Sequence, residues 1–395
     1  MKPAFSLGAV LAVASLALAT AKDREIVDSE TLRDSIEEAE LVSKAQTIEA
    51  FAYAYPEKNR LPGTPGFEDT MQYIWDILDD LDYYDLSRQR YNIIAQTKEG
   101  DTDNVLHLGA HMDSVAAGPG INDNASGGIG ILEVAIQLAN YTVNNAVRFS
   151  WWSAEEEGLI GSEIYVDMLS EEERQKTRLY LNFDMIASPA HKFGVYTSDF
   201  SGLGVTPAPG VEEVEEMFQD YFDDIADLEW DTVALRGNSD HWPFVWEEIP
   251  TGGLHAGTDP NYHTANDTVA NMDPGVFVKI TKAIAHAVAT YASPPLLPTP
   301  PVPPPSPQPC STSPARPHKY LAPDAAERRR REEPPQAGDK DDADDRQRPE
   351  EDGQDGCEGA AADQDAVGEE DGRQPGDGAH VVQACAEEEG VDEDA

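Results

Sequence analysis

The chain of 395 residues is long enough for one large domain or two ordinary ones. Its formal net charge is −47. Residues 294–395 contain 26 acidic and 10 basic side chains, which leaves 49 acidic and 18 basic ones, a net charge of −31, in residues 1–293. Such a charge repels a phosphate backbone, so we expect no nucleic-acid partner. Cysteine occurs only at positions 310, 357 and 385, so neither a disulfide nor a thiolate metal site can hold together a domain that precedes them.

The N-terminal stretch MKPAFSLGAVLAVASLALATAK is typical of a secretory signal peptide, with one early lysine, an apolar run and the small residues Ala19-Thr20-Ala21. The apolar run is short for a membrane anchor, and no other segment is apolar enough for stable membrane insertion. We therefore expect residues 1–21 to be removed and the protein to be secreted, with the vacuole as an alternative destination. Residues 22–41 are acidic and helix-prone, and we interpret them as a short pro-segment or a surface helix.

Hydrophobic periodicity predicts helices and strands in alternation after this segment. Helices are expected at 40–55, 67–81, 128–140, 161–169, 209–225 and 273–291. Strands are expected at 90–98, 104–113, 145–156, 178–188, 192–198 and 249–257. Asp273 and Pro274 suit the N-cap and the first turn of the last helix. This alternation favours a single α/β domain with a mostly parallel central sheet.

The predicted domain ends before the segment SPPLLPTPPVPPPSPQP, because so many prolines cannot continue a helix or a strand. The chain beyond this segment is charged, poor in aromatic residues and without hydrophobic periodicity. We interpret residues 294–395 as a proline-rich linker followed by a disordered acidic tail.

Polar residues gather where several predicted strands end. His111 and Asp113 close one strand, glutamates 155–157 follow the next, Asp184 lies near the end of a third, and His263 comes after the last. In an open α/β sheet, ligands bind outside the carboxyl ends of the strands. Imidazole and carboxylate groups are ligands that suit zinc or a similar divalent ion.

Each of these residues also has an ordinary structural interpretation. Paired glutamates are usually solvated, Asp123 can cap the helix that follows it, and His263 can be a loop histidine. Asp113 can cap a turn, or it can orient the ring of His111, because residues i and i+2 of a strand share a face. Taken one at a time, the residues therefore do not establish a metal site.

The motifs GAHMDS, GINDNASG, WWSAEEEGLIGSE, NFDMI, SDHWPF and YHTANDT follow one another in the chain. With these motifs, residues 42–292 resemble the co-catalytic di-zinc exopeptidases of metallopeptidase family 28, which include secreted leucyl aminopeptidases and vacuolar aminopeptidase Y. The resemblance implies a three-layer α/β sandwich with a mixed, mostly parallel central sheet flanked by helices. The zinc exopeptidase domain would span residues 42–293.

The same resemblance implies two Zn²⁺ ions per chain. His111 and Asp184 would bind one ion, and Glu156 and His263 would bind the other. Asp123 would bridge the two ions as a shared carboxylate.

Three further residues have roles that the resemblance implies. Asp113 would orient His111, Glu155 would be the general base, and Tyr262 would help to stabilise the oxyanion. Two adjoining metals can share a water, lower its pKa and polarise the scissile carbonyl. Glu155 could then take the proton of that water and pass it to the leaving amine. The predicted function is that of a secreted, monomeric zinc aminopeptidase that removes apolar N-terminal residues from peptide or protein substrates.

Two departures from the family pattern concern the substrate pocket and an inserted domain. The segment HAGTDPN before Tyr262 is shorter than the corresponding loop of many relatives, which is often closed by a disulfide. The stretch YYDLSRQRYNIIAQ leaves no room for the protease-associated domain that some relatives carry.

Three alternative functions fit the same fold. A carboxypeptidase or dipeptidase needs a basic residue to hold a free carboxylate, and Arg236 is the only Arg or Lys between Gly194 and Lys279. A glutaminyl cyclase works with a single zinc ion. An inactive binding ectodomain is expected to have lost metal ligands, whereas here every implied position is filled.

Three glycosylation sequons occur, at Asn124, Asn140 and Asn266. In a secreted glycoprotein, Asn140 and Asn266 are the predicted acceptors. Asn124 directly follows Asp123, so we expect the metal site to enclose it and to prevent glycosylation.

Overall fold

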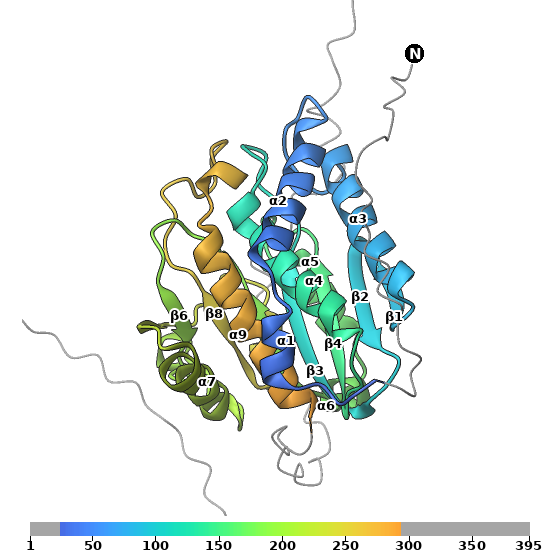
Figure 1. Ribbon diagram of the computed structural model, residues 1–395, viewed down its shortest axis with the longest axis vertical. Coiled ribbons are helices and arrows are strands. Elements are labelled where there is room, and N and C mark those ends of the chain that lie inside the picture. Colours follow the sequence, from blue (N-terminus) through green and yellow to red (C-terminus); the bar gives the residue numbers. More distant parts are fainter. Residues whose placement is uncertain (1–23, 294–395) are drawn as a thin grey trace, which may run out of the picture. The chain divides into compact units, whose positions relative to one another are not determined.

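The computed structural model describes residues 24–293, so the predicted signal peptide at 1–21 and the predicted linker and tail at 294–395 lie outside the described residues. The strands form one 8-stranded sheet in the order β1-β2-β4-β3-β5-β8-β6-β7 (Figure 1). Its centre consists of parallel neighbours: β4 (Asn145–Trp152), β3 (Asp101–His111), β5 (Thr177–Phe183) and β8 (Thr251–His255).

Antiparallel pairs extend this parallel centre on both sides. β2 (Asn92–Thr97) pairs antiparallel with β4, and β1 (Tyr84–Gln89) pairs antiparallel with β2. On the other side, β6 (Phe193–Tyr196) runs antiparallel to β8, and β7 (Trp230–Val233) runs parallel to β6. The predicted α/β fold with a mixed, mostly parallel sheet is therefore confirmed.

Helices cover both faces of the sheet, which gives three layers. One face shares a large hydrophobic core with α2 (Glu38–Tyr53), α3 (Pro65–Leu81), α4 (Gly127–Leu138) and α9 (Pro274–Ala292) (Figure 1). On the other face, side chains of α5 (Ile160–Met168) and α8 (Trp242–Trp246) pack with Trp152 and Tyr180 in a second cluster. The remaining α-helices of residues 24–293 are α1 (Ser29–Asp34), α6 (Glu171–Lys176) and α7 (Val211–Asp220).

Capping and periodicity explain why α3 and α9 form where the sequence predicts them. The Asp273 side chain accepts a hydrogen bond from the Val276 N–H at 3.1 Å, directly before Pro274 opens α9. The apolar stripe of α3 is buried against the sheet and consists of Phe67, Met71, Ile74 and Leu78. Both helices therefore follow from local signals together with one apolar face.

Residues 24–36 pack onto the rest of the domain. The Val27 N–H donates to the Thr142 carbonyl at 2.9 Å, and the Leu32 side chain of α1 is buried in the main core. The Ser29 hydroxyl lies 2.7 Å from Nδ1 of His286 in α9. The His286 side chain is half-buried between α1 and α9.

The periodicity of the sequence does not predict β1, β7, α6 and α8. β1 and β7 are the edge strands, and most of their side chains are partly or fully exposed. α6 and α8 have 6 and 5 residues, which is too short for an amphipathic pattern to develop. Among residues 24–293, no helix is long and apolar enough to cross a membrane.

Candidate metal centre

The carboxyl ends of β3, β4 and β5 meet at one edge of the sheet. His111 is the last residue of β3 and pairs with Trp152, the last residue of β4. Glu155 and Glu156 follow β4 after a short turn, and Asp184 directly follows β5. The parallel register therefore brings the polar residues of three separate motifs to the same edge.

The first set of ligands, here called the inner group, consists of His111, Asp184 and Oδ1 of Asp123. Nε2 of His111 lies 3.5 Å from Asp184 Oδ1 and 3.5 Å from Asp123 Oδ1. Two ligand atoms of a tetrahedral zinc ion lie about 3.4 Å apart, given bonds of about 2.1 Å. His111 is only 1% exposed and the Asp123 and Asp184 side chains are 7% and 14% exposed, so the inner group is mostly buried.

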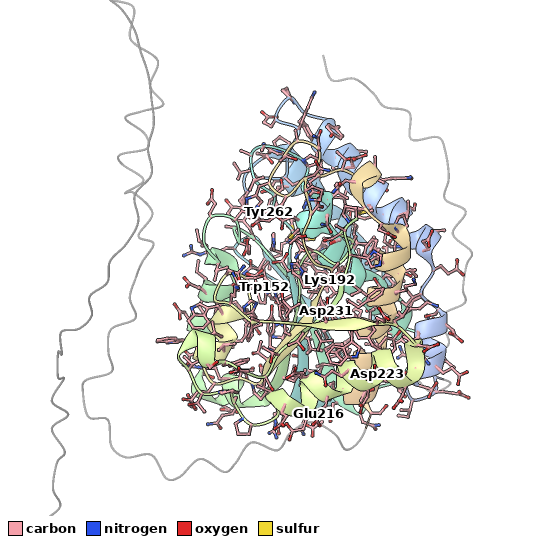
Figure 2. All side chains as sticks on the ribbon, turned by 90° about the vertical axis from the view of Figure 1, so that its left-hand side faces the viewer. Trp152, Lys192, Glu216, Asp223, Asp231 and Tyr262 are labelled. Atoms are coloured by element: carbon pink, nitrogen blue, oxygen red, sulfur yellow. The ribbon has the colours of Figure 1, made fainter. Side chains whose placement is uncertain are left out.

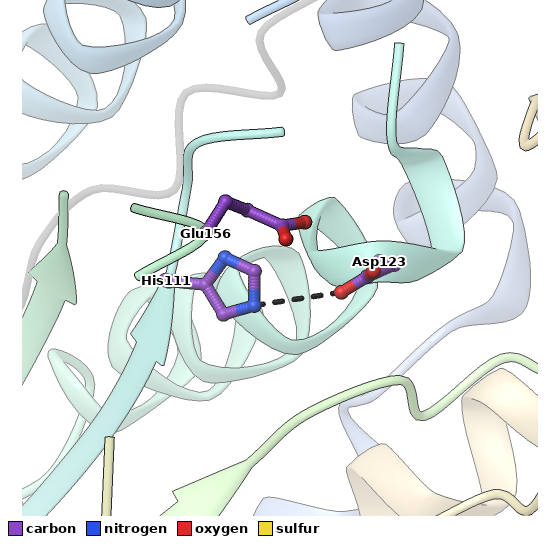
Figure 3. Close-up of side chains that lie close together, drawn as sticks. All are labelled: His111, Asp123 and Glu156. Carbon is purple, nitrogen blue, oxygen red and sulfur yellow. Dashed lines mark ion pairs between the residues drawn. The ribbon is translucent and has the colours of Figure 1, made fainter. Parts of the chain in front are cut away.

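The second set, the outer group, consists of His263, Glu156 and Oδ2 of Asp123. Nε2 of His263 lies 2.9 Å from Glu156 Oε2 and 3.1 Å from Asp123 Oδ2. The two oxygens of Asp123 thus face two different imidazoles, which is the geometry that a bridging carboxylate requires. Figure 3 shows the His111 ring and the carboxylates of Asp123 and Glu156 converging on one space.

The chemistry of these atoms fits a divalent metal. Several buried polar atoms lack a hydrogen-bond partner and belong to these two groups: His111 Nε2, Asp123 Oδ2, Glu156 Oε1 and Asp184 Oδ1. Each buried polar atom without a partner costs about 1–3 kcal/mol. A bound cation would satisfy these atoms together, so the residues present fit a metal centre.

Glu155 lies close enough to the inner group to serve as either a base or a ligand. Its Oε2 lies 3.8 Å from His111 Nε2, and one set of atoms that could hold a metal is formed by Glu155, His111 and Asp184. Glu156 belongs to a different set, with His111 and Asp123. Both glutamates thus share a candidate ligand set with His111, and mutation can tell a base from a ligand.

The pKa values of His111, Glu155 and Glu156 are all raised in the cluster without a bound cation. Burial lowers the pKa of His111, but the carboxylates of Glu155 and Asp184 raise it well above its ordinary value. Burial raises the pKa of Glu155 well above its usual range and the pKa of Glu156 to about 8. Metal binding requires neutral imidazole and ionised carboxylates, so His111, Glu155 and Glu156 would have to give up these protons to hold a cation.

Asp113 contacts both the first histidine and the turn that carries the glutamates. Its Oδ1 lies 3.5 Å from His111 Nδ1. Its two carboxylate oxygens also accept hydrogen bonds from the backbone N–H groups of Glu155 and Glu156, each at 3.2 Å. The predicted contact with His111 is therefore accompanied by a second one, which ties the end of β3 to the turn after β4.

Tyr262 lies at the mouth of the outer group. Its side chain is 50% exposed, and its ring stacks on the His263 ring with a centroid distance of 3.7 Å. Figure 2 shows Tyr262 at the end of the domain away from Glu216 of α7. Burial raises the pKa of Tyr262, so its hydroxyl keeps its proton and can donate a hydrogen bond.

Two further histidines near this edge stay outside both groups. His241 is 1% exposed, its Nε2 contacts the Arg236 carbonyl oxygen, and burial lowers its pKa to about 4. Nδ1 of His255 accepts a hydrogen bond from the Gly257 N–H at 2.8 Å. Both imidazoles therefore have contacts within the fold.

The sequence did not single out Asp267 and Ser239, which hold the proposed ligands in place. The Asp267 carboxylate accepts hydrogen bonds from the Asn122 N–H at 2.7 Å and from the Asp123 N–H at 2.9 Å. The Ser239 hydroxyl donates to Asp184 Oδ2 at 2.7 Å. Both residues lie in quoted motifs, YHTANDT and SDHWPF, but only the folded chain shows which atoms they contact.

Arg60 is another residue that the sequence did not reveal. Its side chain is fully buried, and Nε donates to the Pro119 carbonyl at 2.7 Å. The guanidinium also donates to the carbonyls of Met112 and Gly120. Arg60 therefore fixes the loop between the strand end at His111 and Asp123 at three points.

Left-handed backbone conformations occur next to the ligands. Ala154, before Glu155, has φ 55°, and Met185, after Asp184, has φ 55°, while His263 itself has φ 58°. Non-glycine residues rarely adopt such angles, and residues that do so cluster at functional sites. The local backbone thus supports a site at this edge without identifying its chemistry.

Comparison with known proteins agrees with the geometry of the site. Residues 92–288 match the model of peptidase family M28. Leucine aminopeptidase 2 of Trichophyton equinum is 46% identical over 226 residues, which cover 52% of this chain and 46% of that protein. The chain thus spans about half the length of the curated relatives that it matches.

Solved structures at low identity share the fold. The LapA aminopeptidase of Legionella pneumophila matches with a TM-score of 0.56 at 19% identity, over 70% of this chain and 78% of that one. The glutaminyl cyclase of Porphyromonas gingivalis matches with a TM-score of 0.51 at 17% identity, over 66% and 98%. The fold alone therefore does not separate a peptidase from a cyclase. The sequence matches show that the chain belongs to peptidase family M28.

Proposed function

We propose that the protein is an aminopeptidase with two zinc ions per chain, one in the inner group and one in the outer group. The observation that carries this proposal is the position of Asp123, whose Oδ1 lies 3.5 Å from His111 and whose Oδ2 lies 3.1 Å from His263. A carboxylate between two imidazoles suits a pair of adjoining metals better than a single one. The family match and the name of the Trichophyton relative support an aminopeptidase.

The residues around the ions divide the work of hydrolysis. When bound, the metals supply Lewis-acid polarisation of the scissile carbonyl and an activated water. Glu155 takes the proton of the attacking water and returns it to the leaving amine. Tyr262 donates a hydrogen bond to the negative charge that develops on the carbonyl oxygen. Asp113 orients the His111 ring and holds the backbone of the turn that carries Glu155.

The charge of the domain favours recognition of the N-terminus of a peptide. The net charge of −31 in residues 1–293 and the single basic residue Arg236 between Gly194 and Lys279 leave little on that side to hold a carboxylate. Acidic groups at the same edge, such as Glu155 and Asp184, can hold a free α-amine. We further propose that the enzyme prefers apolar N-terminal residues. We also propose that the protein is a secreted, N-glycosylated monomer whose catalytic domain spans residues 42–293.

Zinc quantification and a small set of substrates test the proposal. The active protein should contain two zinc ions per chain and should hydrolyse leucyl-p-nitroanilide. Acetylation of the α-amine should slow cleavage at least about tenfold, because acidic groups that would hold the amine lose their partner. One zinc ion in fully active protein, with cyclisation of N-terminal glutamine, would support the cyclase. Cleavage of acetylated peptides that depends on a free C-terminus would support the carboxypeptidase.

A further inference from the structure

A pocket of about 270 Å³ lies beside the turn that carries the proposed base. Its walls are formed by the loop at 62–63, the hairpin turn at 90–91, the turn after β4 and the start of α5. Ala154 and Glu157 both line the pocket, so Glu155 and Glu156 lie between two of its wall residues. The pocket therefore adjoins the centre on the side of β4, away from β8.

The frame of this pocket is held by a buried polar side chain. Asn92 is 2% exposed, and its Nδ2 donates to the Gly161 carbonyl of α5 at 2.9 Å. Its Oδ1 accepts a hydrogen bond from the Ser153 N–H at 3.0 Å. One side chain thus joins the β1–β2 hairpin, the turn after β4 and α5.

Arg90 is a basic residue in the lining of this pocket, and its backbone has a conformation that is unfavourable for a residue other than glycine. Gln89 pairs with Asn92, so Arg90 and Tyr91 form a two-residue hairpin turn, in which Arg90 has φ 56°. Such turns favour glycine, asparagine or aspartate at positions with positive φ. A strained residue that persists in a turn points to a role for its side chain.

The guanidinium of Arg90 has no partner within the described part of the chain. No carboxylate of residues 24–293 lies within 4.0 Å of it, although the domain is strongly acidic. Arg88 of the same hairpin differs, because it donates to Gln72 at 2.9 Å and lies 4.8 Å over the Trp75 ring. Next to Arg90, the Tyr91 side chain is 55% exposed and adds apolar surface to the pocket.

We infer that this pocket receives the substrate residue that follows the scissile bond, and that Arg90 binds the free C-terminal carboxylate of dipeptides and tripeptides. The inference rests on the proposed aminopeptidase function and assigns a preference for short peptides to it. Ala154 and Glu157 flank Glu155 and Glu156 in the chain, so a substrate held at Glu155 would have this pocket beside its scissile bond. Glu157 on the same wall disfavours an acidic side chain at this position.

The test compares leucyl-alanine with leucyl-alanine amide and with leucyl-p-nitroanilide, using the zinc-loaded protein at one pH. The free dipeptide should have a KM about tenfold lower than its amide, since a charge-assisted hydrogen bond is lost in the amide. Arg90→Gln should remove this difference and leave hydrolysis of the anilide within about twofold of the wild type. Arg90→Lys should restore part of the preference.

Two more variants separate this effect from a fault in folding. Arg90→Gly removes the charge and places the residue that suits positive φ in the turn, so its Tm should be equal or higher while the preference is lost. Arg88→Gln removes the same charge from the same hairpin and should keep the preference. Equal KM values for dipeptide and amide in the wild type, or an unchanged ratio in Arg90→Gln, would overturn the inference. Failure to hydrolyse the anilide would instead contradict the aminopeptidase proposal itself.

Discussion

His111 and His263 occupy equivalent places in the two ligand groups but are held by different parts of the fold. His111 ends β3 and is 1% exposed, in the middle of a parallel sheet. The His263 side chain is 38% exposed, in a loop that follows β8. The inner group is thus fixed by the sheet, whereas the outer group is fixed by loop contacts.

The outer group depends on a few side chains that bring separate loops together. Asp267 lies in the same loop as His263 and binds the backbone at Asn122 and Asp123, so it joins the loop to the bridging carboxylate. Asp113 positions the backbone of Glu156 in a similar way. A sheet holds the inner ligands through many backbone hydrogen bonds, so we expect loss of one side chain to disturb the outer group more.

Removal of metal should have the largest effect and should separate the two groups. A chelator should abolish hydrolysis, and zinc should restore it. Because His263 is partly exposed and His111 is enclosed, the outer ion should leave first, which gives a species with one metal per chain. Zinc content and activity measured along a chelator titration test this order, and simultaneous loss of both ions would show that the groups do not differ.

Glu155→Gln and Glu156→Gln form a matched pair at neighbouring positions. Glu155→Gln should keep both metals and lower kcat by about 10²–10⁴, the usual contribution of a general base. Glu156→Gln should lose the outer metal and keep the inner one. Metal content and kcat should be measured on both variants, and exchanged phenotypes would reverse the assignment of base and ligand.

Asp267→Asn should weaken the outer group without unfolding the domain. The amide cannot accept from two N–H groups as the carboxylate does, so zinc affinity should fall about 10–100-fold, the usual effect of residues that orient ligands. Asp273→Asn, at the N-cap of α9 and away from the ligands, is the matched control. Competition with a fluorescent zinc chelator measures the affinity, and an equal loss in both variants would contradict a specific role for Asp267.

The stability of the metal-free protein should fall as pH rises from about 6.5 to 8. Burial raises the pKa of Asp240 and Asp267 to about 7 in the folded protein, and that of Glu156 to about 8. In this range the unfolded chain binds fewer protons than the folded one at these groups, so stability decreases with pH. Burial lowers the pKa of His241 to about 4, which acts in the opposite direction but only below about pH 6.5.

Zinc should remove this pH dependence, because the cation stabilises the ionised carboxylates. Thermal unfolding with and without zinc measures the effect as a gap in Tm that widens with pH. A metal-free protein whose Tm rises between pH 6.5 and 8 would show that other groups dominate.

The smallest expected effect on activity comes from loss of a glycan near the metal centre. Asn124 is fully buried, donates to the Phe183 carbonyl at 2.9 Å and accepts from Met185 N, whereas Asn266 is exposed in the outer loop. Glycan should therefore map to Asn266 and Asn140, and Asn266→Gln should change kcat/KM by about twofold or less. Mass spectrometry that finds glycan on Asn124 in active enzyme would contradict this arrangement.

Much of the fold could be predicted because its central elements carry their own signals. β3 and β4 each contain a mostly apolar, buried run, and α3 and α9 combine capping residues with an apolar stripe. The edge strands β1 and β7 carry no comparable pattern, since most of their side chains face solvent. A buried segment leaves a hydrophobic pattern in the sequence from which its secondary structure can be predicted, whereas an exposed segment leaves no such pattern.

The candidate site divides in the same way. Residue type and the predicted strand ends pointed to His111, Asp113, Glu155, Glu156, Asp184 and His263, and the family motifs added roles for Asp123 and Tyr262. The structure brings all of them to one edge, while their catalytic roles stay predictions. Asp267 and Arg60 were not predicted, because they act by holding backbone atoms that lie about 60 to 145 positions away in the chain.

The sequence by itself determined most of the buried segments, the order of the longer helices and the central strands, and the donor atoms that accumulate at strand ends. Those properties are local, because they depend on periodicity, capping and residue type. Only the tertiary structure decided that Asp123 has one oxygen toward each histidine, that Asp267 ties the two loops together, and that Arg90 reaches the pocket beside Glu155. These relations join residues far apart in the chain, so they are set by the register of the sheet and the paths of the loops, which no local pattern encodes.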